Sequence, residues 1–141
     1  MDPLKALKDK FKRLPDALPG IMKESFEQIK ASVEDMNIEQ LDRGERADYS
    51  SLPNYSITSI RKFGKPPGPM ILYDQGDFWQ GITLVVTDDG VELVGRDLKT
   101  QMLQLRYGDN IIGLQEDNKE RVEQDHLAPE MEPRVKEYFE K

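Results

Sequence analysis

The segment 20–42 constrains the fold more than any other part of the chain. Its large apolar residues recur at steps of four, three, four and three, namely Met22, Phe26, Ile29, Val33 and Met36. This spacing places a narrow apolar stripe along one side of an α-helix. The stripe is only about two heptads long, which is short for a coiled coil. We interpret it first as core and second as an inter-subunit seam through Phe26 and Ile29.

Two runs of alternating apolar residues predict a β-hairpin over residues 71–96. The alternating positions are Ile82, Leu84 and Val86, followed by Val91, Leu93 and Gly95. Between them, Asp88, Asp89 and Gly90 predict the turn, with Asp-Gly supplying positive φ at its centre. Since a lone hairpin is only marginally stable, we expect the helix over 20–42 to cover one of its faces.

A second structural turn is predicted at Asp74 and Gly76, where a stiff proline-rich segment meets the expected sheet. The Asp carboxylate can accept a backbone N–H two residues on, and Gly tolerates positive φ. Phe78 is then expected to begin the buried face. The carboxylates near the expected strand ends lack the alternating spacing of a calcium loop, so we interpret them as folding devices.

Further helices are expected at both ends of the chain. Residues 1–19 form a predicted N-terminal helical arm, with a stripe of Leu4, Leu7, Phe11 and Leu14 and breaks at Pro15 and Pro19. The arm either packs on its own domain or docks on a partner. Toward the C-terminus, 97–108 is predicted helical with Leu98, Met102 and Leu105 inward. Helices over 116–127 and 130–141 are predicted to be separated by Pro129 and Pro133.

Together these elements predict one domain over residues 1–141 with an α+β fold. Long N-terminal helices would pack on a small antiparallel β-sheet, followed by C-terminal helices. Residues 43–70 interrupt this order as a long polar loop rich in Gly, Pro and Ser. A loop of this length is usually functional or disordered.

The loop carries few apolar anchors, which we expect to contact a neighbouring subunit. They are Leu52, Tyr55, Ile57, Ile60 and Phe63, the last lying among the basic residues Arg61, Lys62 and Lys65. The stretch 55–60 suits either a strand or one helical turn. Burying these side chains offsets only part of the cost of ordering the backbone, so we expect the loop to become ordered against a partner.

Composition narrows the function. The chain has no cysteine and one histidine, which excludes disulfides, thiolate chemistry and a site with several histidines. A net charge of -7 argues against dedicated nucleic-acid binding. No apolar run approaches the length of a membrane span, and no glycine-rich phosphate loop follows a strand. We therefore expect no enzymatic activity, no cofactor, no metal and no membrane partner.

The order of short motifs from about residue 41 to residue 127 provides a further indication. These motifs are Leu41-x-Arg43-Gly44, Leu52-Pro53-x-Tyr55, Leu72-Tyr73-Asp74-x-Gly76-Asp77-Phe78, Asp97-x-Lys99, Tyr107-Gly108 and Ile111-Ile112-Gly113-Leu114, before a polar helix. This order resembles that of small tailed-phage virion morphogenesis proteins, the tail-completion and head–tail joining proteins of the phage neck. Gln75 stands where those proteins have the threonine of Asp-Thr-Gly.

The resemblance implies a structural protein rather than a catalyst. It implies a homo-oligomeric ring in the virion, made in the bacterial host cytoplasm, with portal or connector and tail proteins as partners. DNA would pass through the ring without sequence-specific binding, and an acidic surface would let the duplex slide. The alternative is a non-viral soluble protein-interaction adaptor domain.

Overall fold

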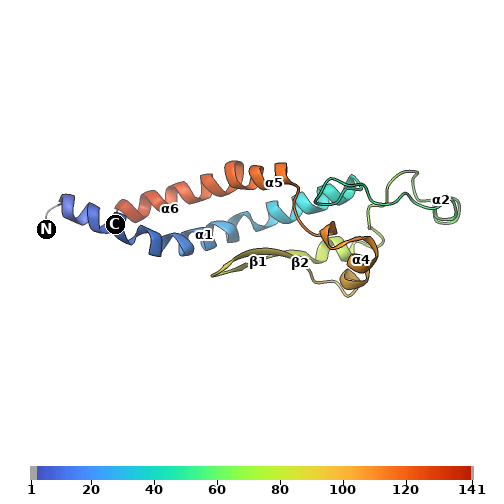
Figure 1. The fold of residues 1–141 in the computed structure, drawn as a ribbon, viewed down its shortest axis with the longest axis horizontal. Helices are drawn as coiled ribbons and strands as arrows, with labels where there is room; N and C mark the ends of the chain where they lie inside the picture. The colour runs from blue at the N-terminus through green and yellow to red at the C-terminus, as the bar shows by residue number, and fades with distance from the viewer. Residues whose placement is uncertain (1–2, 141) are drawn as a thin grey trace.

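The molecule is elongated and consists of three layers (Figure 1). The computed structural model describes residues 3–140, and helix α1 (Pro3–Asp42) forms the middle layer. The C-terminal helices pack along one side of α1, and a two-stranded antiparallel sheet packs on the other. The predicted α+β class, with a long N-terminal helix on a small sheet and C-terminal helices, is therefore confirmed.

Helix α1 runs for 40 residues without a break. The prediction that Pro15 and Pro19 end a separate arm is wrong, because both prolines lie inside this helix. Each proline removes one backbone hydrogen bond, but the C-terminal helix contacts α1 before Pro15 and, through Arg134 and Glu24, after Pro19. The Phe11 and Phe139 ring centroids are 4.6 Å apart, and the Tyr138 hydroxyl donates to the carbonyl of Lys10 at 2.7 Å.

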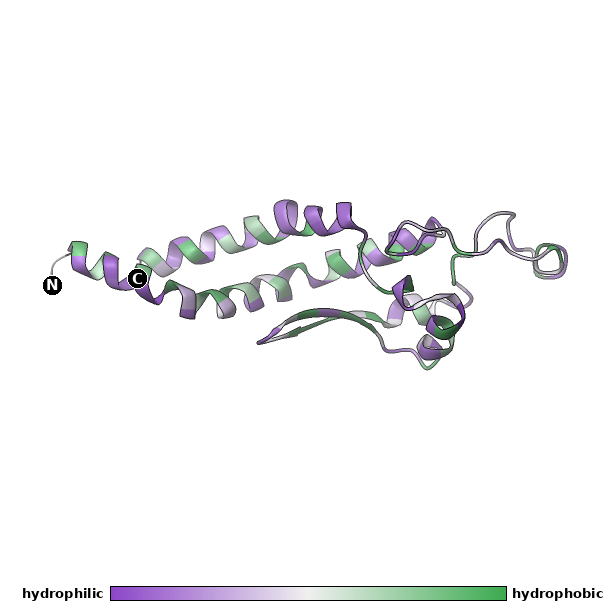
Figure 2. Ribbon diagram, in the orientation of Figure 1, coloured by the Kyte–Doolittle hydropathy of each residue, from purple (hydrophilic) through white to green (hydrophobic). Residues whose placement is uncertain are grey.

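The sheet is the predicted hairpin, formed by β1 (Ile82–Thr87) and β2 (Gly90–Gly95). Thr87 pairs with Gly90 and Ile82 pairs with Gly95, so Asp88 and Asp89 alone form the turn. Gly90, with φ of 148°, is therefore the first residue of β2 and not the centre of the turn. Figure 2 shows apolar residues along both strands and at intervals along α1.

The segment before β1 is not part of the hairpin, which corrects its predicted start at residue 71. Gly76, with φ of 85°, precedes the short helix α3 (Asp77–Gly81). Positive φ at Gly76 agrees with the predicted turn at Asp74 and Gly76. Phe78 is buried as expected, although on a helix rather than on a strand.

The chain after the sheet is almost entirely helical. Helix α4 (Thr100–Tyr107) leads to a short 3-10 turn (Asp109–Ile111), and then α5 (Glu116–Arg121) begins a continuous rod. A π-helical turn (Val122–Leu127) joins α5 to α6 (Ala128–Glu140). Neither Pro129 nor Pro133 breaks the rod, contrary to the prediction. The π turn ends two residues before Pro129 and contains Asp125, whose carbonyl lies four residues before that proline.

Two apolar clusters hold the layers together. The first joins α1, β1 and the C-terminal rod through Ile29, Val33, Met36, Leu84, Val122 and Leu127. The second lies near the C-terminal end of α1 and contains Leu41, Leu52, Phe78, Ile82 and Ile111. The stripe of segment 20–42 is thus core at Ile29, Val33 and Met36, as expected. It reaches the surface at Met22, and Phe26 is half-buried at the edge of the first cluster.

A buried polar network fixes residues 111–118 to α1. Asn37 donates to the carbonyl of Ile111 at 3.1 Å and accepts from the N–H of Gly113 at 2.9 Å. The Gln40 amide donates to the carbonyl of Gly113 at 2.9 Å, and its oxygen accepts from the N–H of Gln115 at 2.9 Å. The same oxygen accepts from the Asn118 amide at 2.8 Å. Because these amide groups are satisfied within the chain, they fix the position of residues 111–118 on α1.

Candidate functional site

The predicted interaction residues divide between core and surface. Leu52 is only 2% exposed and packs in the second apolar cluster, so its predicted contact with a neighbouring subunit is wrong. Its N–H donates to the carbonyl of Gly44 at 2.7 Å, which draws this part of the loop onto the end of α1. Ile29 is likewise buried, so the seam interpretation does not hold there. Phe26, in contrast, keeps part of its surface free.

The loop 43–70 folds into defined local structure. Asn54 and Pro69 form a β-bridge, and the N–H of Tyr55 donates to the carbonyl of Gly68 at 3.0 Å. Between these closing contacts lies α2 (Ile57–Phe63). The stretch 55–60, which suited a strand or a helical turn, is therefore helical from Ile57 onward.

Helix α2 is capped at both ends by its own sequence. The Ser56 hydroxyl accepts from the N–H of Ser59 at 3.1 Å, and Gly64 adopts the left-handed conformation with φ of 65° at the C-cap. Ile57 is 68% exposed and Phe63 is 71% exposed, while Ile60 is half-buried. No residue of α2 is buried, so its apolar stripe faces outward. We refer to residues 57–63, with their basic side chains Arg61 and Lys62, as the α2 tip.

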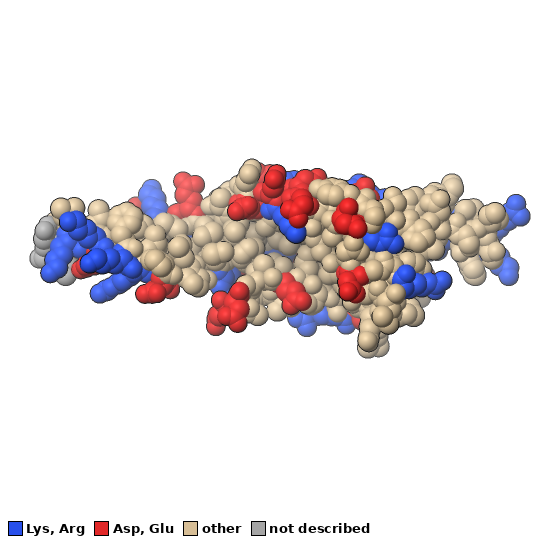
Figure 3. Space-filling model, viewed as in Figure 1, with Lys and Arg blue, Asp and Glu red and all other residues tan. Residues whose placement is uncertain are grey.

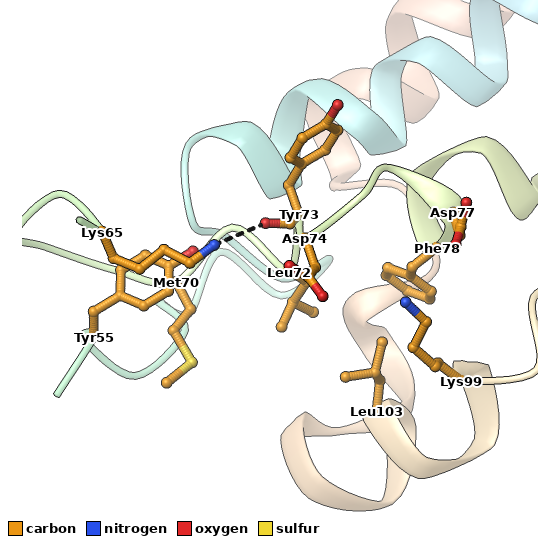
Figure 4. A pocket seen from close by; sticks show the side chains of 10 residues that line it. All are labelled: Tyr55, Lys65, Met70, Leu72, Tyr73, Asp74, Asp77, Phe78, Lys99 and Leu103. Carbon is orange, nitrogen blue, oxygen red and sulfur yellow. Dashed lines mark hydrogen bonds between the residues drawn. The ribbon is translucent and has the colours of Figure 1, made fainter. Parts of the chain in front are cut away.

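A recess of about 280 Å³ lies at the base of the loop (Figure 4). It is lined by apolar and aromatic side chains together with two lysines and two aspartates: Tyr55, Lys65, Met70, Leu72, Tyr73, Asp74, Asp77, Phe78, Lys99 and Leu103. The Lys65 ammonium donates to the carbonyl of Tyr73 at 3.4 Å and lies 5.7 Å from the centroid of the Tyr55 ring. The Tyr55 hydroxyl accepts from the N–H of Ile71 at 3.3 Å. The contacts of Tyr55 with Lys65 and Ile71 thus link the segment before α2 to the segment after it.

An apolar groove runs between α1, β2 and the C-terminal rod. Its two parts, of about 320 Å³ and 210 Å³, share Phe26 and Val91. The other apolar lining residues are Pro19, Met22, Val33, Leu84, Val86, Leu93, Leu114 and Val122. Asp88, Asp89 and Glu92 stand along this groove, which we name the acid-rimmed groove. The predicted turn residues Asp88 and Asp89 therefore also line this surface groove.

The side of the 97–108 helix that was predicted to face inward faces outward, so that prediction is wrong. Leu98 is 99% exposed, and Met102 and Leu105 are exposed as well. Leu103, which is half-buried, packs against the second apolar cluster in their place. The helix begins later than predicted, at Thr100, with Asp97 accepting from the N–H of Lys99 at 3.0 Å.

The N-terminal part of α1 is also partly open. Leu4, Leu7 and Phe11 are exposed, although Phe11 contacts Phe139. Figure 3 shows Lys and Arg side chains at both ends of the molecule, with acidic side chains between them. The basic residues at the two ends belong to the first turns of α1 and to the α2 tip.

One carboxylate near the polar network has a shifted pKa. Hydrogen bonds from Gln115, at 3.2 Å, and from Arg43, at 3.1 Å, lower the pKa of Glu45 below its ordinary value. Sequence reasoning did not single out this network. A signal was nevertheless present, because Asn37 and Gln40 continue the spacing of the buried stripe that contains Val33 and Met36.

The open features of the described residues are mainly apolar surfaces. Within residues 3–140, no group of three or more His, Cys, Asp or Glu side chains is placed to hold a metal ion. In the same range, no helix is both long and apolar enough to cross a bilayer. The open features are instead apolar surfaces at the α2 tip, the acid-rimmed groove, α4 and the start of α1. No protein-family model, curated protein or solved structure matches this chain.

Proposed function

We propose that the chain is a structural, non-catalytic subunit of a tailed-phage or prophage virion. It would be a head–tail joining or tail-completion protein of the neck that forms an oligomeric ring. The proposal combines the resemblance of residues 41–127 to that protein class with the surface of the molecule.

One observation carries the proposal: large apolar side chains are exposed on separate surfaces of the same small subunit. They include Phe63 at one end, Phe11 near the other, Leu105 on α4 and Leu98 just before it. Single exposed apolar residues are ordinary, but contiguous apolar surfaces with charged borders are typical of protein contacts. A subunit that meets neighbours on several sides is expected to have such surfaces.

The charge distribution supports passage of DNA rather than its retention. With 27 acidic against 20 basic residues, the subunit has a net charge of -7, which repels a duplex. We expect no measurable retention of double-stranded DNA at about 0.15 M salt, where surface charges are screened beyond about 8 Å.

The test is the protein content of virions. Virions released from a lysogen that carries this gene are purified by density gradient and analysed by quantitative mass spectrometry. We expect the chain to copurify with the portal in a fixed ratio of at least several copies. Its absence from virions that contain the portal would contradict the proposal, even if the isolated chain forms oligomers.

An adaptor domain is the second candidate, and α4 is the observation that favours it. Met102 and Leu105 on α4, with Leu98 just before the helix, are exposed apolar side chains of a kind that docks against a groove of one partner. An adaptor of this kind would remain monomeric and would be absent from virions, so the same measurement separates the two functions.

A further inference from the structure

The α2 tip and the acid-rimmed groove have complementary chemistry. We infer that the α2 tip of one copy docks into the acid-rimmed groove of the next copy and forms the repeating contact of the assembly. This inference rests on the proposed ring function, for which it supplies the interface.

Size and apolar character are the first argument. Phe63 and Ile57 present exposed apolar side chains, and nothing in α2 is buried within its own chain. An engineered cavity of about 150 Å³ is enough for a benzene ring. The wider part of the groove, at about 320 Å³, thus has room for the Phe63 ring, and the narrower part, at about 210 Å³, has room for Ile57.

Charge is the second argument. Arg61 and Lys62 on the tip form no ion pair among residues 3–140, and in that same range neither do Asp89 and Glu92 on the groove. The two lysines of the groove are already paired. Lys23 contacts Asp88 at 3.0 Å, and Lys119 contacts Glu116 at 3.1 Å. In the proposed contact, the two unpaired cations of one copy's tip therefore meet the two unpaired anions of the next copy's groove. This complementarity favours the correct orientation of the contact.

Position is the third argument. The hairpin turn points away from α2, which lies at the far end of the molecule (Figure 1). The tip and the groove of one subunit are therefore not in contact, and a tip can enter only the groove of another copy. Because the two surfaces differ, the contact is heterologous, and repeated heterologous contacts close into a ring when the rotation allows it.

The test uses two variants, each of which disables one side of the contact. Phe63→Asp disables the tip, and Val91→Lys disables the groove at a residue that is already exposed, because the added cation repels Arg61 and Lys62. Sedimentation and light scattering of each variant alone should show self-association at least about 30-fold weaker than that of the wild type, as for the loss of an interface hot spot. An equimolar mixture should form a dimer and nothing larger, because only one intact tip and one intact groove remain to pair.

Gln28→Glu on α1 is the matched control, since it adds a charge at an exposed residue that belongs neither to α2 nor to the lining of the groove. It should leave self-association within about twofold of the wild type. If Val91→Lys does not fold, Arg61→Glu with Lys62→Glu replaces the pair. Assembly should then be lost and should return when Asp89→Lys and Glu92→Lys are added to the same chain.

The outcomes distinguish the inference from the function on which it rests. Rings that persist in both Phe63→Asp and Val91→Lys would overturn this contact and leave the neck function intact. A mixture that stays monomeric, or a Gln28→Glu variant as defective as the other two, would also overturn it. A wild-type chain that remains monomeric at every concentration would overturn the contact and count against the ring.

Discussion

The carboxylate of Glu34 on α1 accepts a hydrogen bond from the backbone N–H of Leu84 on β1 at 2.7 Å. The sheet has two strands, so β1 has a strand neighbour on only one edge. Backbone groups on an open edge invite pairing with other chains. Glu34 satisfies one of them with a charged acceptor, and this contact holds the hairpin against the helix.

Removal of this carboxylate should weaken the junction between helix and sheet. Glu34→Ala should lower the free energy of unfolding by about 1–2 kcal/mol, because a partly buried N–H loses a charged acceptor. Asp35→Ala, one residue along on the exposed side of α1, should change it by less than about 0.5 kcal/mol. Urea denaturation measures both values, and equal effects of the two substitutions would contradict the assigned role.

Gln40 should be among the most sensitive positions in the chain. Its side chain is fully buried and takes part in three hydrogen bonds, to Gly113, Gln115 and Asn118. Gln40→Leu should cost about 3 kcal/mol or more, because it leaves several buried polar groups without partners. Glu39→Leu, on the exposed side of the same turn, is the control and should cost little. A folded Gln40→Leu chain as stable as the wild type would show that the network does not stabilise the fold.

The sequence predicted elements of the fold correctly where their periodicity agrees with the tertiary packing. The four-three spacing that contains Ile29 and Val33 predicted the buried side of α1, and alternation predicted the hairpin, although Gly90 belongs to β2 and not to the predicted turn with Asp88 and Asp89. Both signals come from side chains that the core excludes from water, so local pattern and global packing coincide.

Prediction failed where a long-range contact overrides a local rule. Pro15, Pro19, Pro129 and Pro133 are local signals of helix ends, yet packing between α1 and α6 keeps both rods continuous. Helix α4 has apolar residues on two of its sides. Only the position of the second apolar cluster decides that Leu103 packs against it and that Leu105 stays exposed.

The candidate site was only partly predictable. Composition and spacing identified Ile57 and Phe63 as anchors of the loop, and the structure leaves both exposed. Leu52 was assigned to the same surface, because nothing local distinguishes a loop leucine that folds back onto Leu41 from one that faces a partner. The groove was not predicted, since it joins α1, β2 and the C-terminal rod, which are distant in sequence.

Gly90 and Gly20 differ in backbone conformation, so replacing each with alanine should change the stability of the chain in opposite directions. Gly90→Ala should destabilise the hairpin by about 1 kcal/mol, since φ of 148° is strained for any L side chain. Gly20→Ala should stabilise the chain by about 0.5–1 kcal/mol, because Gly20 lies inside α1. In both places a new Cβ would meet no atom within 4 Å, so steric clash does not enter. Thermal unfolding of the two variants should therefore give shifts of opposite sign.

Acid should weaken the contribution of Glu45. The pKa of this carboxyl is lowered in the folded chain, first by the hydrogen bond from Gln115 and then by that from Arg43. Its contribution is therefore complete above the pKa of the unfolded chain, close to 4.5, and is lost as the pH falls through the lower folded pKa. Glu45→Gln should be less stable than the wild type at pH 7, and the difference should shrink toward pH 3. A difference that stays constant over this range would contradict the assignment.

The α2 tip should be the first place where trypsin cuts the free subunit. Helix α2 has seven residues and no buried side chain, so its local opening costs little free energy. Arg61 and Lys62 are exposed there, whereas Lys30 lies on α1 beside the buried Ile29, where cutting requires opening of the core. We expect initial cleavage after Arg61 or Lys62, and Arg61→Gln with Lys62→Gln should remove these early products and leave the later ones unchanged. In the assembled protein the same cuts should be at least about tenfold slower, because docking holds the tip closed. Cleavage at Lys30 as early as at the tip would show that α2 is as firmly held as the core of the fold.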